Sequence, residues 1–124
     1  MSEFAERFED LRIWREAREQ ARLVYCDFGF ETPAERDFGF RDQIQRAAVS
    51  VMNNIAEGFE RFSKREFAHH LGIAKGSCGE VRSMFYLAED LGYLPSETAE
   101  ERRKFAIGLS RGIEALNKKL RQAI

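Results

Sequence analysis

Residues 46–80 constrain the fold of this chain most strongly, because they contain two helical patterns joined by a short turn. Apolar residues recur here at spacings of three and four, the repeat of a helix with one buried face. Ser63 and Glu66 have the spacing of a capping box, so the second helix is expected to begin at the turn near Phe62. The two apolar series are Ile44, Ala48, Val51, Ile55 and Phe59, and then Phe67, Leu71, Ala74, Cys78, Val81, Phe85 and Ala88.

The middle of each of these helices has very little charge. Residues 47–56 contain no charged side chain, and residues 67–79 contain only Lys75. A helix in water normally places charges opposite its buried face, so this uncharged surface favours a second contact, such as another subunit. Gly72, Gly76 and Gly79 lie within two turns, where each costs about 0.8–1 kcal/mol against alanine if exposed. Close backbone packing would explain these glycines, and a locally weak helix is the alternative.

The rest of the chain predicts two further helices. Residues 32–35, Thr-Pro-Ala-Glu, match an N-cap, an N1 proline and an N3 glutamate, so a helix is predicted over 34–61, with Gly39 as a point where it can break. A glycine stop and an N-cap at Ser96 separate helices predicted over 64–91 and 97–122. Short connections favour one all-α domain over 1–124, an antiparallel up-down-up-down four-helix bundle. The first helix, predicted over about 10–28, has a stripe of Trp14, Ala17, Ala21, Val24 and Phe28.

Length and charge set further limits. With 124 residues, the chain can form one core without disulfides or a metal. Its formal net charge of -1 gives no overall attraction to nucleic acid or to an anionic membrane. Cys26 and Cys78 both fall on or beside core stripes, as free cysteines do in reduced proteins. No apolar run approaches membrane-spanning length and residues 1–12 have no signal core, so a cytoplasmic location is expected.

Two patterns that suggest catalytic or metal-binding chemistry are incomplete. Glu66 and His69 have the Glu-x-x-His spacing of di-iron bundles, but such a site needs a second motif and two further glutamates. The chain has only two histidines, and they are adjacent. Cys78 lies eight residues from His70, or ~12 Å along a helix, which is too far for a thiol and its base. We therefore predict no catalytic residue, no metal and no cofactor within one subunit.

Basic residues concentrate in the last helix. Residues 102–121 contain seven basic side chains and a single acidic one, Glu114. Lys104, Arg111 and Lys118 recur every seven residues away from the apolar stripe and form one exposed line, with Arg121 close behind. Such a line is either a solvated face or, repeated around an oligomer, a multivalent surface for phosphates. A smaller second candidate at the 61–65 turn consists of Arg61, Lys64 and Arg65.

The chain shares residues with a known protein family over nearly its whole length, from about residue 8 to 120. The chain resembles the four-helix-bundle proteins associated with intervening sequences of bacterial 23S ribosomal RNA genes. In the first half, the matching residues are Trp14, Ala17, Tyr25, Gln43, Arg46, Ala47, Ala48, Ser50, the run Asn54–Gly58, and Arg61. In the second half they are Ser63, Glu66, Phe67, Leu71, Ile73, Ala74, Gly76, Ser77 and Glu80.

The resemblance implies an antiparallel four-helix bundle that assembles into a ring-like homo-oligomer, a pentamer. Related proteins serve as accessory factors of diversity-generating retroelements, where nucleic-acid binding has been proposed. The family has no established catalytic residues. The polar signature residues are expected to form a network between helices or subunits, including a pair between Glu57 and Arg61. The structural signature or subunit interface comprises Arg46, Ser50, Asn54, Glu57, Gly58, Gly72, Gly76, Ser77 and Glu80.

Together these observations predict a non-enzymatic oligomeric scaffold or accessory protein that binds RNA or DNA through basic surfaces. Two alternatives remain open. One is a protein-interaction adaptor whose basic face binds an acidic partner. The other is a metal-dependent enzyme whose site lies at subunit interfaces.

Overall fold

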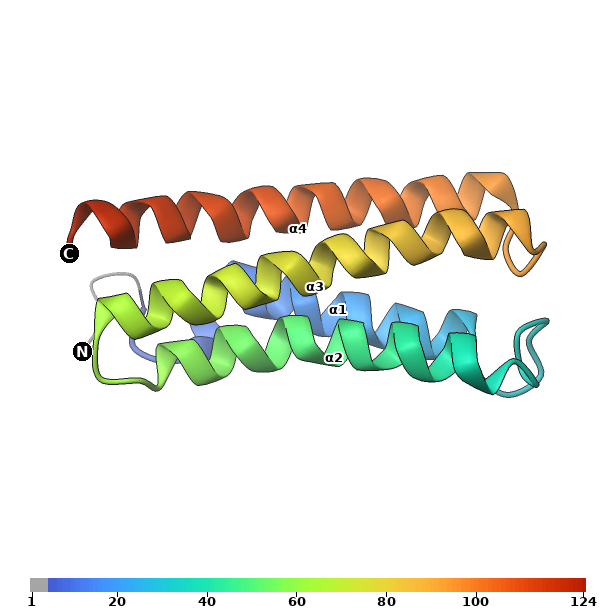
Figure 1. Ribbon diagram of the computed structural model, residues 1–124, viewed down its shortest axis with the longest axis horizontal. Helices are drawn as coiled ribbons and strands as arrows, with labels where there is room; N and C mark the ends of the chain where they lie inside the picture. The colour runs from blue at the N-terminus through green and yellow to red at the C-terminus, as the bar shows by residue number, and fades with distance from the viewer. Residues whose placement is uncertain (1–4) are drawn as a thin grey trace.

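The structure is a computed structural model that describes residues 5–124 of the chain. Its α-helices are α1 (Arg12–Asp27), α2 (Phe38–Phe59), α3 (Lys64–Asp90) and α4 (Ser96–Gln122). A short 3-10 helix, Phe8–Asp10, precedes α1, and no strand occurs among the described residues. Figure 1 shows the α2–α3 turn at the same end as the C-terminus, whereas the α1–α2 and α3–α4 connections lie at the opposite end. The all-α prediction is confirmed.

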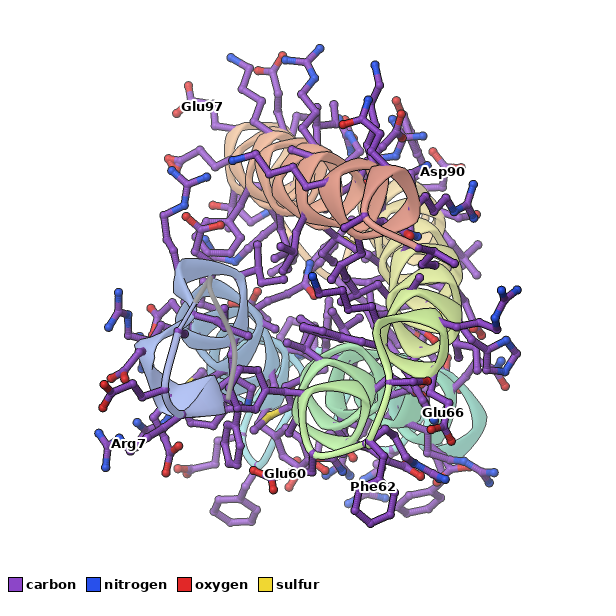
Figure 2. The ribbon with its side chains drawn as sticks, turned by 90° about the vertical axis from the view of Figure 1, so that its left-hand side faces the viewer. Arg7, Glu60, Phe62, Glu66, Asp90 and Glu97 are labelled. Carbon is purple, nitrogen blue, oxygen red and sulfur yellow. The ribbon has the colours of Figure 1, made fainter. Side chains whose placement is uncertain are left out.

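The four helices surround one common interior. Helix α3 packs extensively against both α2 and α4, while α1 packs on α2 and touches α4 much less. Seen along the helices in Figure 2, carbon-rich side chains fill the space between the four ribbons. The predicted stripes supply this core, because Val24, Ile55, Leu71 and Ile113 are all fully buried. Burial of one such side chain stabilises the fold by about 1.5–3 kcal/mol.

The core divides into two clusters along the bundle. One lies toward the α2–α3 turn and is built around Ile55, Phe59 and Phe67. The other lies toward the α1–α2 connection, where the ring centroids of Phe28 and Phe40 are 5.0 Å apart. Met52 packs against both clusters and joins them. Sulfur-containing, unbranched methionine adapts to such an irregular junction.

Helix α2 begins at Phe38, so its predicted start at residue 34 is wrong. Thr32 does not cap a helix, because its hydroxyl donates to the Gly29 carbonyl at 2.7 Å and residues 32–37 form turns. Asp37 is the real N-cap and accepts from the Phe40 amide at 3.2 Å. Its other carboxylate oxygen accepts from the Tyr93 hydroxyl at 2.5 Å, and Tyr93 lies in the α3–α4 connection, 56 residues later in the sequence. Tertiary packing therefore selects the start of this helix over the local proline signal.

Two other local expectations, for Cys26 and Ser96, are corrected. Cys26 is exposed, whereas Cys78 is buried as expected. Ser96 is the first residue of α4 and provides no side-chain cap; its hydroxyl instead hydrogen-bonds to Glu89. Before α1, Phe8 packs on Trp14 with ring centroids 5.1 Å apart. Phe4, a second aromatic residue of the N-terminal segment, lies outside the described residues.

The predicted N-cap at the start of α3 is confirmed, because the Ser63 hydroxyl accepts from the Glu66 amide at 3.1 Å; the hydroxyl also lies 3.3 Å from the Glu66 carboxylate. The close glycine packing expected along α3 is not found within the subunit. A Cβ added at Gly72, Gly76 or Gly79 would meet nothing within 4 Å. The tight position is in α2 instead, where a Cβ at Gly58 would lie 2.7 Å from the Cβ of His70.

We expect Gly58→Ala and Gly76→Ala to change stability in opposite directions. The first pushes a methyl group into α3 and should lower the free energy of unfolding by about 1–3 kcal/mol. The second enters open space and should raise it by about 1 kcal/mol through helix propensity. Urea unfolding followed by circular dichroism measures both. Destabilisation or loss of assembly in Gly76→Ala would place that glycine in a subunit contact.

The Asp37 cap predicts acid sensitivity. Hydrogen bonds from the Tyr93 hydroxyl and then the Phe40 amide lower the pKa of Asp37. A carboxyl whose folded pKa is depressed stabilises the fold above its unfolded pKa, about 3.9, and loses that contribution as the pH falls through its folded pKa. Asp37→Asn keeps a capping oxygen but cannot titrate. Thermal unfolding from pH 7 to pH 2.5 should therefore show a smaller acid-induced loss in this variant, and identical profiles would contradict the expectation.

Candidate functional site

A hollow strip follows the seam between α3 and α4, and we call it the α3–α4 groove. One part has a volume of about 270 Å³ and the other about 480 Å³. Gly72 and Gly79 lie on the α3 side, and their missing side chains keep the groove open. The groove is lined by Gly72, Lys75, Cys78, Gly79 and Arg82 from α3 and by Ala106, Ile107, Ser110, Arg111, Glu114, Asn117, Lys118 and Arg121 from α4.

The groove has a strong excess of positive charge. Arg111, Lys118 and Arg121 of the predicted basic line all lie in it. Helix α3 adds two cations that sequence reasoning did not assign, Lys75 and Arg82. Lys75 had a recognisable signal as the lone charge in an otherwise uncharged stretch. Arg82 had none, because its place beside α4 depends on how the two helices align.

Ion pairing leaves most of these cations available to a ligand. Glu114, the acidic residue of the groove, pairs with Lys75 at 3.4 Å. Within residues 5–124, none of the other four groove cations takes part in an ion pair. Elsewhere on α4, Arg102 binds Asp27 at 2.7 Å and Arg103 binds Glu89 at 2.8 Å, so these two arginines serve structural pairs. Figure 2 shows the long α4 side chains projecting away from the bundle.

The other predicted basic residues lie beyond the groove lining. Lys104 is exposed, one heptad before Arg111 on the same face of α4. Lys64 and Arg65 are exposed at the α2–α3 turn, at the same end of the molecule as the C-terminus of α4 (Figure 1). The third residue of that turn candidate, Arg61, is already held by Glu57 at 2.5 Å and by Glu66 at 3.8 Å.

The signature residues gather on a different seam, between α2 and α3. The Ser50 and Ser77 hydroxyls lie 2.9 Å apart, and the Asn54 amide donates to the Ser50 carbonyl at 2.9 Å. The Asn54 Oδ1 accepts from His70 Nδ1 at 3.0 Å. His70 Nε2 then lies 3.9 Å from Glu57, which accepts from Arg61. These contacts form a polar ladder that joins the two helices within one subunit.

The close approach at Gly58 places His70 within reach of the ladder, a role that no sequence pattern had assigned to it. Hydrogen bonding from Arg61 is the largest cause that lowers the pKa of Glu57. Glu80 accepts from Gln43 across the same seam, whereas Arg46 pairs with Asp42 on its own helix at 3.6 Å. Gly72 and Gly76 stand apart from this network and are exposed.

The described residues do not assemble a recognisable catalytic or metal centre. Burial is the largest cause that raises the pKa of the Cys78 thiol, which opposes a role as a thiolate nucleophile. The Glu66 carboxylate accepts from the Ser63 hydroxyl at 3.3 Å and lies 3.8 Å from Arg61. Within residues 5–124, no three His, Cys, Asp or Glu side chains converge as a metal ion would require. None of the helices in this part of the chain is both long and apolar enough to cross a bilayer.

Two polar side chains are buried among the apolar ones. Gln20 of α1 is 2% exposed and Asn117 of α4 is 7% exposed. The Oε1 of the first and the Oδ1 of the second have no hydrogen-bond partner among the described residues. Such a group costs about 1–3 kcal/mol when left unsatisfied. Asn117 borders the larger part of the groove, and sequence reasoning missed it because it occupies a core-facing position four residues after Ile113.

The fold and the two seams define a helical-bundle protein with an internal polar ladder and a separate basic groove. The chain matches the model of the family described as 23S rRNA-intervening sequence protein over residues 9–115, and it belongs to that family. The predicted resemblance is confirmed. No curated protein matches the chain.

The fold is similar to a solved structure of a protein with unknown function, from the S23 ribosomal protein family of Bacteroides thetaiotaomicron. The TM-score is 0.79 and the sequence identity 21%, over 86% of this chain and 95% of that chain. At this sequence identity the comparison supports the fold only, so a function has to be argued from the residues of this chain.

Loss of the Asn54 side chain should open the polar ladder. Asn54→Ala removes the partners of His70 and Ser50 at a part-buried position and should lower the free energy of unfolding by about 1–2 kcal/mol. Asn53→Ala, the matched change at the exposed neighbouring residue, should stay within about 0.5 kcal/mol of the parent. Chemical unfolding of both variants provides the comparison. Equal losses of stability would show that the ladder does not stabilise the fold.

Proposed function

We propose that this protein is a non-enzymatic oligomeric scaffold or accessory factor that binds RNA or DNA through the α3–α4 groove. The observation that carries the proposal is the set of four groove cations without an ion-pair partner in the described structure. Phosphates are the ligands that such a row of lysines and arginines binds most readily, because each contact releases condensed counterions.

The spacing along α4 suits a polymer better than a single anion. Arg111 and Lys118 are seven residues apart, which is ~10.5 Å along a helix, and Arg121 follows about one turn later. Binding should be directed at the backbone, because the groove lining contains no aromatic platform for stacking bases. The formal net charge of -1 makes this attraction local to the groove.

Assembly would multiply the effect of each groove. Connections at alternating ends support an antiparallel up-down-up-down bundle (Figure 1). The family resemblance implies a ring-like homo-oligomer of five subunits. Exposed apolar side chains, among them Phe38, Phe62 and Ile73, offer surface that a second copy could cover. Grooves repeated around a ring would raise the effective affinity for a long polymer. The two free cysteines fit a reduced, cytoplasmic location.

The test is a titration of fluorescent structured RNA and duplex DNA at 50 and 200 mM salt. We expect binding to weaken steeply with salt and to be lost when the groove residues Arg111, Lys118 and Arg121 are together changed to glutamate. The matched control changes Arg7, Arg15 and Arg36 to glutamate, which are exposed arginines outside the groove. This control gives the same change in net charge and should retain binding.

Equal loss in both triple variants would assign binding to overall charge rather than to the groove. Absence of binding to either polymer at both salt concentrations would overturn the proposal. Capture of an acidic protein by the parent but not by the groove variant would then support the adaptor alternative. A stoichiometric metal in the purified oligomer, lost in His69→Ala, would support the interface-enzyme alternative.

A further inference from the structure

The larger part of the α3–α4 groove is bordered by a polar group that has no partner in the described part of the chain. Asn117 is more than nine-tenths buried, and its Oδ1 has no hydrogen-bond partner among residues 5–124. Its side chain borders the volume of about 480 Å³ between α3 and α4. The Oδ1 atom itself exposes less than 1 Å², so a group that enters from outside reaches it only when the amide turns about its last side-chain bond toward the open volume.

The surroundings of Asn117 leave room for that group. Gly72 stands across the groove on α3, and a Cβ there would meet nothing within 4 Å. Lys118 and Arg121 border the same volume and have no ion-pair partner in the described part of the chain. A ligand that reaches Asn117 therefore passes beside cations suited to phosphate.

The unsatisfied atom selects the chemistry of the ligand. Phosphate oxygens only accept hydrogen bonds, so they cannot satisfy an amide oxygen. The ribose 2′-hydroxyl both donates and accepts, and it lies one sugar away from the phosphates of the same strand. An asparagine amide offers one acceptor and two donors, which matches that hydroxyl in either direction. Deoxyribose has no such group.

We propose that Asn117 binds a ribose 2′-hydroxyl, so that the α3–α4 groove prefers RNA over DNA. This inference rests on the proposed function and specifies its substrate class. Lys118 and Arg121 bind neighbouring phosphates, and Asn117 adds the contact that distinguishes the two sugars. Base amines can also donate to an amide oxygen, but they occur in both polymers and would produce no preference for RNA.

The experiment measures affinity for RNA and DNA oligonucleotides of identical sequence, each as a single strand and as a duplex, by fluorescence anisotropy. The parent protein should bind RNA about three- to tenfold more tightly than DNA, the ratio expected of one added hydrogen bond. Asn117→Ala should bring RNA affinity down to the DNA value and leave DNA affinity unchanged. Asn53→Ala, the same change outside the groove, should keep the parental ratio.

A second variant separates loss of the RNA preference from loss of folding. Asn117→Leu replaces the unsatisfied amide with an apolar group of similar size and should melt at or above the parental temperature. It should also lose the RNA preference. Circular dichroism and gel filtration confirm that both variants retain helix content and assembly.

The outcomes separate the two proposals. Equal affinity of the parent for RNA and DNA, or an unchanged ratio in Asn117→Ala, would overturn the role of Asn117 and leave groove binding in place. No binding of either polymer would overturn the proposed function itself. Loss of the oligomer in both Asn117 variants, with RNA affinity unchanged, would assign this part of the groove to subunit contact and also overturn the inference.

Discussion

The close approach of α2 and α3 at Gly58 is the constraint on which the rest of the molecule depends. It brings His70 against α2, and the ladder through Asn54, Ser50 and Ser77 then sets the register of the two helices. Because α3 also forms the main interface with α4, that register determines which α3 residues face the groove. The polar seam on one side of α3 thus determines which side chains line the groove on the other side.

The two seams use small residues for opposite purposes. At Gly58 the missing side chain lets two helices close on each other, and polar groups satisfy one another there. At Gly72 and Gly79 it leaves a gap that no neighbouring side chain fills. The first arrangement stabilises the subunit, while the second lowers helix propensity and leaves space for a ligand. Function is therefore expected where the structure accepts a local loss of stability.

Features that depend on local periodicity, such as the buried stripes, were predicted correctly from the sequence. Features that depend on contacts between distant segments, such as the start of α2, were not. Helical spacing identified the buried stripes, and the heptad spacing of Arg111 and Lys118 correctly placed them on one face. The start of α2 was wrong because Tyr93, from another connection, stabilises the Asp37 cap. Lys75 and Arg82 join the groove through helix alignment, which no local pattern encodes. Asn117 was missed because a core-facing position conceals its chemistry.

Charge is also segregated along α4 itself. Its first turns hold Glu97, Glu100 and Glu101, and its last turns hold Lys118, Lys119 and Arg121. Whole side-chain charges exceed the half-charges of the helix macrodipole, so α4 is an electric dipole with its positive pole at the C-terminus. Because the protein is nearly neutral overall, the field of a nearby polyanion orients it through this dipole more strongly than it attracts it through net charge. Near a polyanion, within about 8 Å at physiological salt, the subunit would turn its C-terminal end toward the polyanion before any contact forms.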